Sequence, residues 1–589
     1  MKKKWFSFVF LCLALLYVTR PVLLASLKGM DLSKSDLDSS ILCDTCIGLV
    51  TTVRKLAKLH VSQELIEKAA IEYCEKSGLA DERICKLIIP EFKDEVLYVF
   101  DHTALSSREI CGTILNDKCG STYDPFNQQW NVTIPGGKPP IKPYHPPKVN
   151  ITNRILHISD IHWDPQYTPG LRAQCDEPLC CRPPLPNGGP NNSAGAWGDA
   201  RCDIPLQTVV NLMEHLSATQ DQFEWIYMTG DLPAHNDWSQ TRSGQVDIFN
   251  KMIDLFDQYL PNKPMFYSFG NHESDPVNSF PPNYITGSNS ISWLYDAAAD
   301  KLKKWLNTTD AYNTFKSGGF YSVDYNGIRI ISLQTNYCNK QNWWLLINGT
   351  DPDGMLQWFI EKLLDAEKKG MKVHVLGHIS PGDGADCSNA WSTNYKKIAL
   401  RFENTIAGQF FGHSHQDRFH LMVDFETNTP PRPYGILYLG PSVTTYQNQN
   451  PGYRIYTVDG NYNESSRQVL DHDTYILNIT DANLTNKPKW IHEYSAKDAY
   501  NMTNLTPDSW LSLLKEFLKN NTLFLKYYHY FCKSYYMDSL CNGDCQKQAT
   551  CNCLTTFSST NACNAITAVP LTKEEIEKMM LYEKFHDHC

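Results

Sequence analysis

The sequence has no excess of basic residues and, beyond its first 25 residues, no long apolar run. It carries 54 Lys and Arg against 64 Asp and Glu, a formal net charge of −10 with histidines neutral. Binding to the phosphate backbone of a nucleic acid needs a basic surface, so we exclude nucleic acid as a partner. The lack of a later apolar run excludes a membrane span beyond the N-terminus.

The N-terminus has the pattern of a secretory signal peptide, which we predict over residues 1–25. Lys2–Lys4 precede an apolar run, Trp5–Val18, and Ala25-Ser26 offers small residues for cleavage. The alternative is a retained signal anchor, because Pro21–Leu24 extend the apolar run.

Twenty cysteines behind such a leader indicate an oxidising compartment and a disulfide framework. Loss of Cys12 with the leader leaves an odd number, and we predict that Cys589 is the unpaired thiol. Scattered Asn-x-Ser/Thr glycosylation signals fit the same compartment. We therefore expect a lysosomal or secreted protein.

Residues 40–122 are predicted to form a small helical domain stapled by disulfides. Apolar residues recur there at helical spacing, as in Ile47, Val50 and Val53. Six cysteines alone allow fifteen connectivities, so their spacing leaves the pairing open. Cys43 and Cys46 alone would also fit a redox or zinc pair, but no second pair at metal-binding spacing accompanies them.

The rest of the chain divides into three parts. Residues 123–150 are rich in proline and are predicted to be a semi-rigid extended linker. Residues 151–470 alternate strands and helices, which predicts an α/β sandwich flanked by helices. Residues 471–589 are predicted to be a helical, disulfide-braced subdomain.

Five short blocks of metal-binding residue types each follow a predicted strand of the α/β part. Because loops at the carboxyl ends of strands converge, we expect these side chains to meet at one site. Any one of these residues alone would fit a capping Asp or a hydrogen-bonded loop His; the five blocks together favour a centre for two metals. The blocks are Asp160-Ile161-His162, Gly230-Asp231, Gly270-Asn271-His272-Glu273, Gly377-His378 and Gly412-His413-Ser414-His415.

In their order the blocks resemble the calcineurin-like metallophosphoesterase superfamily. The resemblance implies one metal held by Asp160, His162 and His415, a second held by Asn271, His378 and His413, and Asp231 as the bridge. Purple acid phosphatases share this scaffold but carry a tyrosine three residues after the bridging aspartate, where this chain has Ala234. Two zinc ions are therefore expected rather than an iron pair.

Two further histidines are candidates for proton transfer. A metal-activated hydroxide would attack phosphorus, and the leaving oxygen then needs a proton. We predict that His272, next to Asn271, supplies it, with His235 as the second candidate. His235 also fits a histidine that only positions the phosphate.

Longer strings resemble the acid sphingomyelinase family: DLPAH from Asp231, GNHESDPVNSFP from Gly270, GHISPG from Gly377 and NPGYRIYTVDGNY from Asn450. The N-terminal cysteine unit resembles a saposin domain. Together they imply hydrolysis of sphingomyelin to ceramide and phosphocholine at acidic pH by a monomer. The saposin domain would contact the membrane surface and present the lipid. The alternatives are a phosphodiesterase acting on other phospholipids or nucleotides, and a lipid-binding protein with an inactive catalytic domain.

The resemblance also implies most of the disulfides. In the saposin-like unit it pairs Cys43 with Cys119, Cys46 with Cys111, and Cys74 with Cys85. In the catalytic part it implies Cys175–Cys180, Cys181–Cys202 and Cys338–Cys387. For the tail, where two cysteines lack counterparts, we predict Cys532–Cys553, Cys541–Cys545 and Cys551–Cys563.

Overall fold

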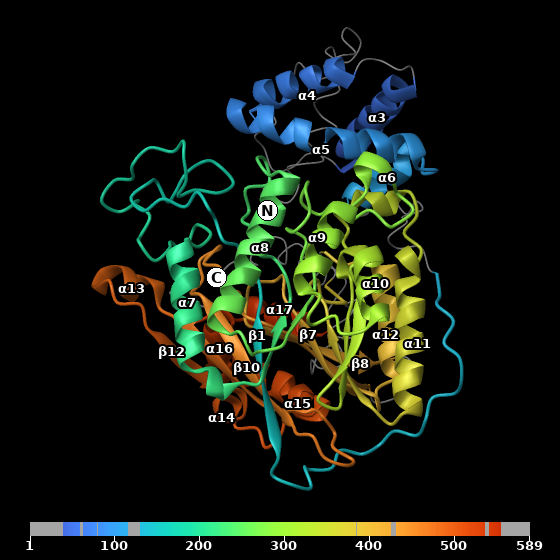
Figure 1. Cartoon of the computed structure of the whole chain (residues 1–589). Coiled ribbons are helices and arrows are strands. Elements are labelled where there is room, and N and C mark those ends of the chain that lie inside the picture. The colour runs from blue at the N-terminus through green and yellow to red at the C-terminus, as the bar shows by residue number, and fades with distance from the viewer. Residues whose placement is uncertain are drawn as a thin grey trace.

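The computed structural model describes residues 39–58, 63–78, 80–115, 130–383, 386–425, 431–535 and 541–554. A unit of helices at the N-terminus lies against one end of a two-sheet sandwich, with further helices beside the sheets (Figure 1). The predicted signal peptide, residues 1–25, lies outside the described residues, as do Cys119, Cys563 and Cys589. None of the described helices is long and apolar enough to cross a membrane.

The N-terminal unit is helical, as predicted. Its third helix is capped by Asp81, whose side chain accepts a hydrogen bond from the Ile84 amide. Disulfides Cys46–Cys111 and Cys74–Cys85 are confirmed; Cys43 is also disulfide-bonded. The helices are α3 (Ser39–Lys58), α4 (Gln63–Ser77), α5 (Glu82–His102) and α6 (Ser107–Leu115).

Two six-stranded sheets form the predicted sandwich. Phe410 lies between them, with its ring centroid 5.0 Å from that of Tyr227 and 4.8 Å from that of Tyr456. In spatial order the first sheet is β12 (Trp490–Ser495), β11 (Val469–Leu477), β10 (Gly452–Asp459), β1 (Thr152–Ile158), β2 (Trp225–Met228) and β3 (Met265–Tyr267). The second is β4 (Tyr321–Tyr325), β5 (Ile328–Ser332), β6 (Lys372–Leu376), β7 (Ile406–Phe411), β9 (Arg432–Leu439) and β8 (Arg418–Asp424).

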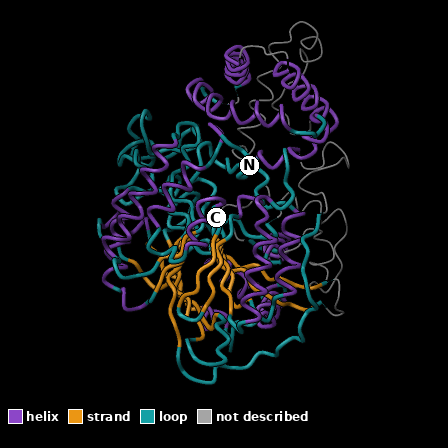
Figure 2. Tube along the Cα trace, turned by 45° about the vertical axis from the view of Figure 1, so that its right-hand side comes forward, coloured by secondary structure: helices purple, strands orange, loops and turns teal. Residues whose placement is uncertain are grey.

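Helices lie around the strands of the sandwich (Figure 2). β1, β2 and β3 are parallel, as are β5, β6, β7 and β9, so their carboxyl ends meet at shared edges. The helices are α7 (Leu206–Ala218), α8 (Arg242–Tyr259), α9 (Ser292–Leu302), α10 (Thr309–Gly318), α11 (Met355–Lys368) and α12 (Asn389–Arg401). Disulfides Cys175–Cys180, Cys181–Cys202 and Cys338–Cys387 are confirmed.

Residues 130–148, which belong to the segment predicted as a linker, form an extended strap without helix or strand. Three side-chain amides of the catalytic part bind its backbone. Asn394 donates to the Trp130 carbonyl and accepts from the Val132 amide, at 2.7 and 3.0 Å. Asn404 accepts from the Lys142 amide and donates to the Pro140 carbonyl. Gln357 accepts from the Thr133 amide and donates to the Thr133 carbonyl. The strap is thus fastened along its length.

The C-terminal part differs from its prediction in the position of its boundary and in one disulfide. The boundary predicted at residues 470–471 falls inside β11, and β12 follows, so the first sheet continues beyond it. Helices follow: α13 (Ile479–Thr485) between these strands, then α14 (Ala496–Tyr500), α15 (Pro507–Phe517), α16 (Asn521–Phe531) and α17 (Asp544–Asn552).

Among the tail cysteines, the predicted Cys541–Cys545 disulfide is confirmed. The predicted Cys532–Cys553 disulfide is wrong, because Cys553 is a free, buried thiol while Cys532 is disulfide-bonded. The Cys553 thiol lies 3.3 Å from the Tyr527 hydroxyl inside the helical packing. Cys551 is disulfide-bonded, but its predicted partner Cys563 lies outside the described residues.

Helix α5 packs on the catalytic part through aromatic contacts and a partly buried pair of carboxyls. Phe92 contacts Trp343 and Tyr98 contacts Trp344, with ring centroids 5.7 and 5.4 Å apart. Glu91 shares a hydrogen bond with the Asp275 carboxylate. Burial, and then the charges of Asp275 and Asp237, raise the pKa of Glu91 to about 10.

This carboxyl pair predicts that α5 docks more firmly at acidic pH. An undocked Glu91 has an ordinary pKa of about 4.3, so the docked form retains a proton that the undocked form releases. The stabilisation is complete below that value and is lost as the pH rises toward the raised pKa. We expect α5 amides to exchange faster at about pH 7.5 than at about pH 5, after correction for intrinsic rates.

A Glu91→Gln variant should remove most of this pH dependence, because the amide can donate to Asp275 without a bound proton. Asp94→Asn is the matched control, since the Asp94 side chain on the same helix is 72% exposed. If wild type and Glu91→Gln lose α5 protection equally between the two pH values, the pair does not control docking.

Candidate metal centre

The five predicted blocks converge at one end of the sandwich, each at or just after the end of a strand. Their backbone is unusual: Asp160, His162, Asp231, His413 and His415 have positive φ angles between 44° and 70°. This region is sparsely populated by residues other than glycine, and such conformations cluster at functional sites. The same end of the sandwich faces the N-terminal helices, whose core also contains Ala234 and Trp238.

Two groups of side chains share Asp231. In the first group, Asp160, His162, Asp231 and His415 each offer an atom within 4.8 Å of the others. In the second, Asp231, His378 and His413 meet the same criterion. Asn271 joins the second group, because its side-chain oxygen lies 3.0 Å from His378 Nε2. All seven predicted metal-site residues therefore lie together.

Backbone carbonyls fix the direction of the imidazoles. His162 Nδ1 lies 2.7 Å from the Pro233 carbonyl, His378 Nδ1 lies 2.6 Å from that of Thr229, and His415 Nδ1 lies 2.8 Å from that of Tyr446. An imidazole that donates from Nδ1 presents a lone pair at Nε2, which suits a metal. His413 is turned the other way, with Nδ1 toward His378 and Nε2 3.1 Å from Asp386.

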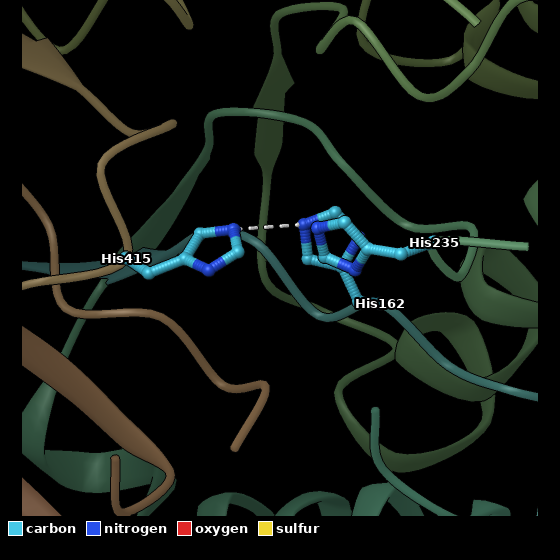
Figure 3. Close-up of side chains that lie close together, drawn as sticks. All are labelled: His162, His235 and His415. Carbon is cyan, nitrogen blue, oxygen red and sulfur yellow. Dashed lines mark hydrogen bonds between the residues drawn. The ribbon is translucent and has the colours of Figure 1, made fainter. Parts of the chain in front are cut away.

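The arrangement leaves acceptor atoms facing one another. Figure 3 shows His162 and His415 with Nε2 atoms directed at each other, 3.1 Å apart. Burial lowers the pKa of both, which disfavours the extra proton that could bridge them. His378 Nε2 likewise lies 3.1 Å from Asp231 Oδ2. Burial opposes charge on His378, but Asp231 outweighs it and raises the pKa to about 9. This position therefore favours a positive charge, either a proton on Nε2 or a metal ion in its place. These donors fit cations.

Glycines allow the loops to approach closely. A Cβ on Gly230 would overlap the Gly270 backbone, and one on Gly270 would overlap the Asp231 carboxylate. A Cβ on Gly412 would overlap Ser159 and crowd Asp160. The glycine that precedes Asp231 thus allows the two loops to approach more closely than any other residue would.

His235 and His272 lie at the edge of this cluster. The ring of His235 stacks on His162 with centroids 3.9 Å apart, and His272 meets His162 edge to face at 4.9 Å. Asp203 holds His235, at 2.9 Å from Nδ1 and 2.7 Å from the amide.

His272 has carboxylates on two sides. Its Nδ1 lies 3.4 Å from Asp237, and its amide donates to Asp231 at 2.9 Å. Burial opposes a charge on its ring, but Asp231 and Asp237 prevail and raise the pKa of His272 to about 9. The ring therefore holds a proton at neutral and acidic pH.

Sequence reasoning missed four residues that support the site. Asp203 and Asp237 contact the two histidines above, and Asp386 contacts His413. Glu273 lay in a predicted block but had no assigned role. Its buried carboxylate accepts from the Leu232 and Asp231 amides, at 2.8 and 3.2 Å, and so clamps the Asp231 loop. Only Glu273 had a local signal, its place next to Asn271-His272.

The fold and this site define a metallophosphoesterase. Residues 153–417 match the family of calcineurin-like phosphoesterases, which with the His and Asp cluster defines a two-metal site. Residues 437–566 match the C-terminal region of acid sphingomyelin phosphodiesterase. The chain belongs to the acid sphingomyelin phosphodiesterase family.

Similarity to curated proteins extends over most of the chain. The sphingomyelin phosphodiesterase of Bos taurus is 40% identical over 533 residues, covering 89% of this chain and 83% of the relative. That of Homo sapiens is 40% identical over 522 residues, covering 87% and 81%. The cyclic GMP-AMP phosphodiesterase of Mus musculus is 30% identical over 415 residues, covering 68% of this chain and 88% of the relative.

Proposed function

We propose that this chain hydrolyses sphingomyelin to ceramide and phosphocholine at a centre of two zinc ions. The observation that carries the proposal is the pair of donor groups that share Asp231. Membership of the family and the names of the relatives above support the substrate. Mixed imidazole and carboxylate donors support zinc, as does Ala234 where an iron enzyme would need a tyrosine.

Each side chain has a proposed role. One zinc would be held by Asp160, His162 and His415, and the other by Asn271, His378 and His413. Asp231 would bind both. When bound, the metals supply charge neutralisation at the phosphoryl group and a water of lowered pKa. His272 gives its ring proton to the departing ceramide oxygen, and Asp237 keeps that ring charged beforehand. His235, oriented by Asp203, contacts the phosphate or shares in proton transfer.

The N-terminal helices are proposed to act as a saposin-like domain that contacts the membrane surface and presents the lipid. Their contact with the catalytic part lies beside the loop that carries His272, where α5 meets Asp275. The disulfides support a lysosomal or secreted location. We propose a monomer without nucleic-acid partners, which light scattering of the purified chain would test.

A substrate panel tests the proposal. Purified chain with zinc at about pH 5 should turn over sphingomyelin in liposomes faster than phosphatidylcholine or cyclic dinucleotides. The second candidate is a nucleotide phosphodiesterase, favoured only by the similarity to the Mus musculus protein. Rapid turnover of cyclic dinucleotides with no release of phosphocholine would replace the lipid proposal by that one.

A further inference from the structure

A lysine from the C-terminal helices lies buried beneath the predicted metal site. Lys533 follows α16, is fully buried, and has a positive φ of 51°, as does Ser534. Its ammonium donates to the carbonyl and the hydroxyl of Ser442, at 2.9 and 2.6 Å. No ion pair within the described part of the chain includes it. Burial lowers the pKa of this amine to about 7. A buried amine outside any ion pair is unfavourable for folding, so its position calls for a further explanation.

Ser442 begins a loop, residues 442–446, that holds one half of the site. Its amide donates to the His415 carbonyl at 3.1 Å, and the Thr444 amide donates to the Asp160 carbonyl at 2.9 Å. The Tyr446 carbonyl in turn orients His415. The loop therefore fixes two of the three residues proposed to hold the first metal with Asp231.

The other half of the site is fixed from elsewhere. His378 is oriented by Thr229, and its amide donates to Thr335. His413 lies 3.1 Å from Asp386 through Nε2, while its amide donates to the Asp160 carboxylate of the first half. None of the described hydrogen bonds joins the 442–446 loop to Asn271, His378 or His413. A substitution that removes the hydrogen bonds to Ser442 should thus weaken the binding of the first metal more than that of the second.

We propose that Lys533 is a positioning residue for the metal held by Asp160, His162 and His415. Its two hydrogen bonds to Ser442 fix the position of the 442–446 loop relative to the site. The loop in turn fixes the orientation of the His415 ring. The Lys533 carbonyl accepts a hydrogen bond from the Asn450 side-chain amide at 2.9 Å, which ties the same turn to the sandwich. The inference rests on the proposed assignment of the metal-binding residues.

The test is zinc binding by Lys533→Met, a side chain of similar length without charge. Zinc is titrated into metal-free full-length protein against a competing chelator, and thermal unfolding is followed in the same samples. Partners that orient metal-binding side chains change metal affinity by about 10- to 100-fold, so we expect one of two zinc ions to bind at least about tenfold more weakly. The unfolding temperature of the metal-free protein should not fall, since an apolar side chain replaces a buried amine outside any ion pair.

Two reference variants make the result specific. His162→Ala removes the first metal directly, and Lys533→Met should weaken the same zinc. Lys526→Met is the matched control: Lys526 also donates to a backbone carbonyl, that of Ala499, at 2.7 Å, but lies in α16 away from the loop. It should bind both zinc ions as wild type does.

Three outcomes would overturn the inference. Lys533→Met could bind zinc as wild type does, or it could bind more weakly the second zinc ion, which His162→Ala still binds. It could also lose both zinc ions equally and unfold at a lower temperature. Wild type that binds no zinc, cobalt or manganese would instead contradict the proposed function.

Discussion

An Asp231→Asn variant is expected to lose tight binding of both metals and at least about a thousandfold of activity. Asp231 is the one carboxylate common to both groups of donors, so its charge acts on both cations. Asparagine keeps the shape, tolerates the positive φ and can still accept from the His272 amide. The loss would therefore reflect charge rather than unfolding.

Elemental analysis after dialysis measures the metal content of Asp231→Asn. Asp247→Asn serves as control, because Asp247 is exposed on α8 and takes part in none of the described side-chain hydrogen bonds or ion pairs. Two metals per chain in Asp231→Asn, at wild-type affinity, would show that this carboxylate does not bridge.

His272→Ala should lower kcat on sphingomyelin by about 10²- to 10⁴-fold while both metals remain bound. The loss should be far smaller on a p-nitrophenyl phosphodiester, because p-nitrophenolate departs without needing a proton. A residue that only orients phosphate would instead affect both substrates alike.

His235→Ala is the matched comparison, since its ring also stacks at His162. Loss on both substrates, mostly in KM, would fit a phosphate-positioning role for His235. If His235→Ala rather than His272→Ala discriminates between the two leaving groups, the assignments of proton donor are reversed.

The convergence of the metal-site residues was predictable because short sequence patterns mark each of them. Each block follows a buried strand, and parallel strands bring their carboxyl ends together, so Asp160 and His413 meet although 253 residues separate them. Glycine before Asp231 and His413 marks close backbone approach.

The missed features depend on contacts that no local pattern records. Asp203 and Asp237 are ordinary loop aspartates until folding brings them to His235 and His272. Spacing does not encode disulfide connectivity, so Cys532 and Cys553 were paired wrongly. β11 was not predicted as a strand, because its residues Asp471, His472 and Asp473 resemble a polar linker. In the structure His472 is buried.

The fastened strap has a consequence for how the N-terminal helices move. Asn394, Gln357 and Asn404 bind the strap from Trp130 onward. The connection from the strap to α6 can therefore be no longer than the chain between Leu115 and Trp130. Fully extended, that length reaches about 50 Å. Helices released from the catalytic part would thus remain at an effective concentration of the millimolar order, and redocking becomes a fast unimolecular event.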